Sequence, residues 1–182
     1  MIKMINRWLE RAHLATYIQQ HDANRRSLTE IFWYDAGVRA IFYYRRAHEL
    51  ALTGHHFQAE RIMAHAKRVT GIEIHPKATI GRDIFIDHGV GTVIGETAVI
   101  GDRVTILHGV TLGSDGRTHT PHAHRHPVVD DDAYIGAHAQ LVGAIHVGHH
   151  AKIGAGAVVI EDVPPYATAV GVPARNIRHR NE

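Results

Sequence analysis

The chain has 182 residues, no cysteine and a formal net charge of +2, with 20 basic and 18 acidic residues. The lack of cysteine excludes a disulfide framework and a cysteine-based zinc site. The near-balanced charge, without a clustered basic face, argues against nucleic-acid binding. The sequence has no apolar run of about 18 residues, so no membrane span is expected. Its first residues also lack the apolar core of a secretion signal, so we expect an unprocessed cytoplasmic protein.

Residues 1–70 are predicted to form an α-helical N-terminal region. Ser27 and Glu30 have the spacing of a capping box, which marks the start of a helix. The following stretch, 28–52, is rich in aromatic residues, and Gly37 weakens its middle enough to allow two helices.

A further helix is expected over 55–70, with Phe57, Ile62 and Val69 on its buried face. Short helices of this kind cannot bury their apolar faces alone. We therefore expect them to pack on the rest of the chain or on a second subunit.

From Gly71 onward the pattern changes to a repeat of six residues. A period of six fits neither a helix nor an alternating strand, and it is typical of hexapeptide solenoids. About thirteen units predict some four turns of a three-sided prism over 71–163, mainly of β structure, followed by a tail over 164–182. The repeating apolar residues are Ile74, Ile80, Ile86, Ile94, Ile100, Ile106, Leu112, Val129, Ile135, Leu141, Val147, Ile153 and Val159.

Two places interrupt the repeat. The step from Ile86 to Ile94 has two extra residues, and a polar loop at about 113–128 separates Leu112 from Val129. A solenoid does not need these insertions in order to fold. Since departures from a structural repeat commonly carry function, we expect the functional residues here.

The residues at the interruptions suit acid–base chemistry on a small acid. His88 lies within the first interruption, and a neutral imidazole is a natural general base. Glu73, fifteen residues earlier, belongs to the preceding turn of the coil and is a candidate partner for that imidazole. At the end of the polar loop, Arg125 can hold a carboxylate through its fork of donors, and His126 can donate a hydrogen bond.

The polar loop also permits a second interpretation, as a metal site. His122, His124 and His126 alternate along it and could instead hold a metal ion.

Six motifs together resemble the serine O-acetyltransferases, a family of hexapeptide-repeat acyltransferases, over about Asp22 to Arg175. The most specific are the Ile-Asp-His-Gly and Arg-His-Pro sequences. The motifs are Gly71-Ile72-Glu73-Ile74-His75-Pro76, Phe85-Ile86-Asp87-His88-Gly89, Val93-Ile94-Gly95-Glu96-Thr97-Ala98, Gly109-Val110-Thr111-Leu112-Gly113, Arg125-His126-Pro127 and Gly171-Val172-Pro173-Ala174-Arg175.

The resemblance implies a left-handed parallel β-helix that transfers acetyl from acetyl-CoA to the hydroxyl of L-serine. The product, O-acetyl-L-serine, is used in cysteine biosynthesis, and no metal is required. By the same resemblance, His88 is the catalytic base and Glu73 its acidic partner, although the family often has Asp there. The residues implied to hold serine are Asp22, Asp87, Arg125 and His126.

Gly113, Ala137 and Ala155 match positions where the pantetheine arm of CoA runs between neighbouring prisms. The helical region is shorter than in long family members, which implies a homotrimer. Members that bind O-acetylserine sulfhydrylase end in Ile, whereas this chain ends in Glu182, so we do not expect that complex.

Three alternatives stay open. The sequence 112–116 departs from the family's Leu-Gly-Gly-Thr-Gly, which allows an acetyltransferase with a sugar or another amino-acid alcohol as acceptor. His108-Gly109 resembles a ligand site of zinc-dependent γ-class carbonic anhydrases, although Arg103 stands where that family has His. The third alternative is a non-catalytic scaffold.

Overall fold

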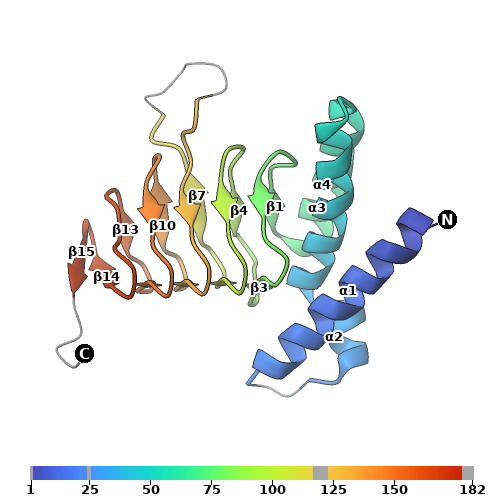
Figure 1. Cartoon of the computed structure of the whole chain (residues 1–182), viewed down its shortest axis with the longest axis horizontal. Coiled ribbons are helices and arrows are strands. Elements are labelled where there is room, and N and C mark those ends of the chain that lie inside the picture. The colour runs from blue at the N-terminus through green and yellow to red at the C-terminus, as the bar shows by residue number, and fades with distance from the viewer. Residues whose placement is uncertain (1, 24–25, 117–122, 178–182) are drawn as a thin grey trace.

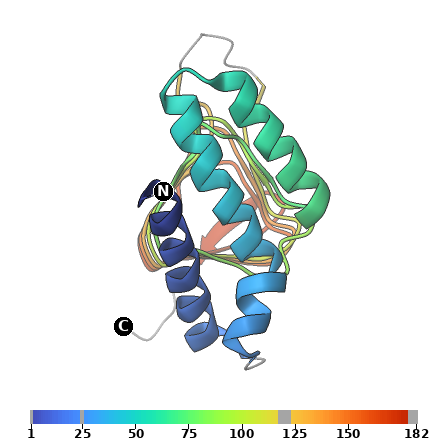
Figure 2. The same cartoon turned by 90° about the vertical axis from the view of Figure 1, so that its right-hand side faces the viewer.

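A computed structural model of the chain describes residues 2–23, 26–116 and 123–177, with side chains from residue 5 onward. A layer of helices covers one end of a long coil of short strands (Figure 1). Seen from the helical end, the turns of the coil nest behind one another (Figure 2). None of the helices in the described ranges has the length and apolar character that a membrane span requires.

The N-terminal region consists of α1 (Ile2–His21), α2 (Leu28–Tyr34), α3 (Ala36–Leu52) and α4 (His56–Thr70). The predicted capping box is confirmed at the start of α2. There the Ser27 hydroxyl accepts a hydrogen bond from the Glu30 N–H at 3.2 Å, and the Glu30 carboxylate accepts one from the Ser27 N–H at 2.9 Å.

The stretch 28–52 forms two helices, but the break lies at Asp35 and not at Gly37. The backbone of Asp35 is extended, and its carboxylate accepts a hydrogen bond from the Val38 N–H at 2.9 Å, which starts α3. Gly37 lies inside α3 against the coil, where an added Cβ would stand 2.5 Å from the carbonyl oxygen of Ile86. Gly37 therefore allows close packing of the helix on the coil.

The expected buried face of α4 is partly wrong. Phe57 is 78% exposed, whereas Ile62 and Val69 are only partly buried. The helix instead packs against α3 and β1 through smaller or more flexible side chains, which permit a closer approach. These buried residues are Ala59, Met63, Ala66 and Thr70.

The strands of the coil are short, and each pairs in parallel with the strand one turn further on. The three sheets of the prism are β1-β4-β7-β10-β13, β2-β5-β8-β11 and β3-β6-β9-β12-β14, with β15 added antiparallel to β14. The strands are β1 (Glu73–Ile74), β2 (Thr79–Ile80), β3 (Phe85–Ile86), β4 (Val93–Ile94), β5 (Val99–Ile100), β6 (Thr105–Ile106), β7 (Thr111–Gly113), β8 (Val128–Val129), β9 (Tyr134–Ile135), β10 (Gln140–Val142), β11 (His146–Val147), β12 (Lys152–Ile153), β13 (Val158–Val159), β14 (Thr168–Gly171) and β15 (Ala174–Ile177).

The register confirms the period of six and both interruptions. Ile94 is paired with Ile74 on one side and with Leu112 on the other, so the extra residues before Ile94 leave the core in step. Ile100 pairs with Val129 across the polar loop. Within the expected tail, β14 still pairs in parallel with β12 and so continues the third sheet.

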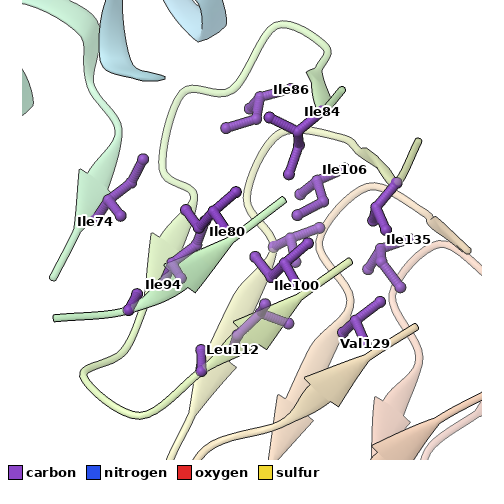
Figure 3. Packing of buried hydrophobic residues seen from close by; sticks show 14 of the residues in the cluster. Ile74, Ile80, Ile84, Ile86, Ile94, Ile100, Ile106, Leu112, Val129 and Ile135 are labelled. Carbon is purple, nitrogen blue, oxygen red and sulfur yellow. The ribbon is translucent and has the colours of Figure 1, made fainter. Parts of the chain in front are cut away.

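Aliphatic side chains of successive strands point into the prism, and Figure 3 shows part of this core, from Ile74 to Ile135. Each is almost inaccessible to solvent, and burying one contributes about 1.5–3 kcal/mol. The residues include Ile74, Ile86, Ile94, Ile100, Ile106, Leu112, Val129, Ile135, Leu141, Val147, Ile153 and Val159.

We predict that Ile135→Ala lowers the free energy of unfolding by about 2–5 kcal/mol, because it leaves a cavity in a closely packed column. Ile160→Ala is the matched control, since Ile160 is 53% exposed, and it should change stability by no more than about 0.5 kcal/mol. Guanidinium unfolding measures both variants. Equal losses would contradict the assignment of Ile135 to the core.

Candidate active site

One edge of the prism, here called the His88 corner, consists of the turns that lead from the third sheet into the first. These turns span 87–92, 107–110, 136–139 and 154–157. Backbone hydrogen bonds of 2.8–2.9 Å join successive turns, so residues far apart in sequence are stacked. The bonds run from Gly91 N–H to Gly71 O, Gly109 N–H to Val90 O, His138 N–H to His108 O and Gly156 N–H to Ala137 O.

His88 projects from this corner. Its backbone has a φ of +61°, a left-handed conformation that side chains other than glycine seldom adopt. The side chain is 70% exposed, and its Nε2 lies 3.9 Å from Oδ1 of Asp87. The two extra residues of this turn thus give an imidazole that is open to solvent and next to a carboxylate.

The three small residues implied to line the pantetheine groove lie in two places. Ala137 and Ala155 both belong to turns of the His88 corner. Gly113 ends β7 instead, opposite Val142 of β10, at the far side of the first sheet.

A second edge, here called the Arg125 corner, consists of the turns that leave the first sheet, 75–78 and 95–98, together with the end of the polar loop at 123–127. Thr97 joins the end of the polar loop to this corner by hydrogen bonds. Its hydroxyl accepts hydrogen bonds from the main-chain N–H groups of Arg125, at 3.0 Å, and His126, at 3.2 Å. The guanidinium of Arg125 pairs with the carboxylate of Glu96.

The tautomer of His126 is set by its surroundings. The residue is 7% exposed, and Nδ1 of its ring accepts a hydrogen bond from the Thr97 main-chain N–H at 3.2 Å. Because an N–H can only donate, Nδ1 is the acceptor, and the neutral ring carries its proton on Nε2. Burial lowers the pKa of His126, and the charge of Arg125 lowers it further. Gly95 makes room for the ring, since a Cβ there would lie 2.1 Å from Nε2.

A cavity of about 430 Å³ between α4 and the first sheet brings together Glu73, Arg125 and His126. The carboxylate of Glu73 lies 2.5 Å from Nζ of Lys67, which also lines the cavity. The cavity is therefore lined by both charges, since Lys67 and Arg125 are paired with Glu73 and Glu96 and Glu60 adds a further carboxylate.

The other predicted residues lie elsewhere. Within the described part of the chain, no hydrogen bond or ion pair joins Glu73 to His88. Asp22 lies just past the end of α1, where it is buried and accepts a hydrogen bond from Nε of Arg26 at 2.7 Å. Arg26 also donates to Asp35 at 2.9 Å. Glu73 still borders the His88 corner, since its main-chain N–H donates to the carbonyl oxygen of Thr92 at 2.9 Å, whereas Asp22 lies apart at the end of α1.

Sequence reasoning assigned no role to Glu96, Thr97 or Lys67. Hydrogen bonds from Lys77 and then Arg125 lower the pKa of Glu96. Two of these residues could have been identified from the repeat. Glu96 and Thr97 precede the end of the polar loop by one turn of the coil, so the repeat predicts that they lie next to it. Lys67 could not be found in this way, because it reaches the cavity from a helix.

The alternatives that involve a metal concern the His-rich loop and the turn at His108 and Arg103. His122 lies outside the described residues, and within the described ranges no three or more metal-binding side chains come together. Arg103, which stands where the carbonic anhydrases have a ligand, pairs with Asp131 at 3.0 Å and Asp132 at 2.7 Å.

Comparison with known proteins gives a uniform set of relatives. No family model matches the chain. It is 48% identical over 154 residues to a serine acetyltransferase of Bacillus subtilis, covering 85% of this chain and 70% of the relative. It is 47% identical over 160 residues to a serine acetyltransferase of Helicobacter pylori, covering 88% and 92%.

Solved structures agree. Soybean serine acetyltransferase complexed with serine has a TM-score of 0.86 and 40% identity, covering 90% of this chain and 66% of the soybean chain. A serine acetyltransferase in complex with CoA has a TM-score of 0.85 and 38% identity, covering 93% and 70%.

We predict that His126 titrates below the ordinary histidine pKa of about 6.5 and that its neutral form is protonated on Nε2. The folded state then binds this proton less readily than the unfolded state. Its contribution to stability is therefore present above about pH 6.5 and is lost as the pH falls toward the folded pKa. Side-chain ¹⁵N NMR measures both properties, with His126→Asn to assign the signal. A midpoint at or above 6.5, or a proton on Nδ1, would contradict the geometry.

Proposed function

Because this chain belongs to the serine acetyltransferase family, we propose that it transfers the acetyl group of acetyl-CoA to the hydroxyl of L-serine. The products are O-acetyl-L-serine, for cysteine biosynthesis, and CoA. The observation that carries the proposal is the exposed His88 on its left-handed turn, within a chain 48% identical to a serine acetyltransferase. We also propose that the coil is left-handed and the protein cytoplasmic.

His88 acts as the general base. Its imidazole removes the proton of the serine hydroxyl while that oxygen attacks the thioester carbonyl. A C–O bond forms, the C–S bond of the tetrahedral intermediate breaks, and His88 returns the proton to the departing thiolate. Main-chain N–H groups at the corner can stabilise the oxyanion.

The Arg125 corner suits the carboxylate of serine. The guanidinium of Arg125 already pairs with Glu96, and its remaining N–H groups can donate to a substrate carboxylate. The Nε2–H of His126 supplies a neutral donor beside it. The carboxylates proposed to meet the serine ammonium are Asp87 and Asp22. Glu73 would orient His88 by turning away from Lys67, its partner in the structure.

A single chain does not bring His88 and Arg125 to one point, because they lie on two edges of the first sheet. We infer that the His88 corner of one copy faces the Arg125 corner of the next copy in a homotrimer. The pantetheine arm would then lie between the copies, beside Gly113, Ala137 and Ala155.

The first test is His88→Ala, which should lower kcat by about 10²- to 10⁴-fold because it removes the general base. His149→Ala is the matched control, since His149 lies on another edge, packed against Tyr166. Release of CoA thiol with serine, and with sugar alcohols in its place, gives the rate and the acceptor. An unchanged rate in His88→Ala would exclude the mechanism.

The second test mixes two inactive variants, His88→Ala and Arg125→Ala, which are unfolded and refolded together. If each site takes His88 from one copy and Arg125 from its neighbour, equal mixing restores about one quarter of wild-type activity. Variants refolded separately and then combined provide the control. A mixture as inactive as its components would show that one chain holds the whole site.

A further inference from the structure

A second cavity, of about 550 Å³, lies between α1, α3 and the turn that follows β2. It shares no lining residue with the cavity at Glu73 and Arg125. Its apolar wall is formed by Leu14, Val38, Ile41, Phe42 and Ile80. The volume lies within the range of sites that hold small organic molecules.

The polar wall of this cavity is strongly cationic. Four guanidinium groups line it, belonging to Arg7, Arg11, Arg45 and Arg82. Among the described lining residues, Glu10 supplies the one carboxylate. This excess of positive charge favours an anionic ligand.

Two of the four arginines are already engaged within the protein. Arg7 pairs with Glu49 at 3.3 Å. Arg45 donates to the carbonyl oxygen of Ile80 at 2.6 Å and also to that of Gly81. These two residues therefore hold α1 and α3 in place around the cavity.

Arg11 is different, because it is buried and packs against aromatic rings instead of a carboxylate or carbonyl among the described residues. The residue is 8% exposed, and its Nε is buried with no hydrogen-bond partner among the described residues. Its guanidinium carbon lies 4.7–5.5 Å from four aromatic ring centres, those of Trp8, Phe32, Trp33 and Phe42. These rings hold the guanidinium in place but provide no acceptor in the plane of its N–H groups, where a ligand carboxylate would bind.

Arg82 lies exposed at the same cavity, and within the described ranges its side chain has no hydrogen bond or ion pair.

We propose that this cavity binds a small organic carboxylate. Its carboxylate accepts hydrogen bonds from Arg11 and Arg82, and its apolar body rests against Ile41, Phe42 and Ile80. A carboxylate matches the planar fork of a guanidinium, and the apolar wall favours an organic ligand over a bare inorganic anion.

The chain provides its own probe for this site. Its two tryptophans, Trp8 and Trp33, both contact the guanidinium of Arg11. Benzoate should therefore change tryptophan fluorescence in a saturable way, with a Kd on the order of 1 mM for so small a ligand. Benzamide, which has the same shape without the charge, should give no saturable change, and inorganic phosphate should bind at least about 10-fold more weakly.

Two variants test the assigned residues. Arg11→Met should weaken benzoate binding by about 10-fold or more, because a charge-assisted pair is lost. Arg82→Met changes an exposed residue and leaves the aromatic rings untouched, so it tests the site even if Arg11→Met folds poorly. It should weaken binding by at least about 3-fold. The matched control is Arg68→Met, on the exposed surface of α4, which should bind benzoate as the wild type does.

The titration contains neither serine nor acetyl-CoA, so its outcome does not depend on the proposed function. Lack of saturable binding by benzoate would overturn the proposal. Equal binding of benzamide or phosphate would overturn the carboxylate assignment, and unchanged affinity in both arginine variants would overturn the site.

Discussion

The structure depends on one constraint, which is that every sixth residue must fill the interior of the prism. Aliphatic side chains of the parallel strands pack on those of the turns above and below, while the backbone pairs with the same neighbours. This interior has no room for polar chemistry. Functional groups are therefore confined to the corners, to the outward positions of the strands and to the helical layer at the end of the coil.

The corners can carry chemistry because changes there do not disturb the core. Two extra residues at the His88 corner leave Ile94 paired with Ile74, and the long loop leaves Val129 paired with Ile100. Thr97 then ties the end of that loop back to the coil through its hydroxyl. The rigid coil thus holds an exposed imidazole on one edge and a guanidinium with a buried imidazole on another.

The sequence predicted the coil well because its period is imposed by the packing of each turn on the next. It predicted the helices less well, because the face that a helix buries depends on its neighbours, and Phe57 is exposed while Met63 is buried. Likewise, the pairing of Glu73 with Lys67 depends on where α4 docks, which no local pattern records. The roles of the site residues stay predictions, since sequence separation does not show which edges of two copies meet.

The most direct test of this account is a crystal structure of the assembled protein with L-serine bound. The account predicts that the serine carboxylate contacts Arg125 of one copy, while the hydroxyl lies within hydrogen-bond distance of Nε2 of His88 in the next copy. A serine held by both residues of a single chain, or bound with its hydroxyl out of reach of His88, would contradict it.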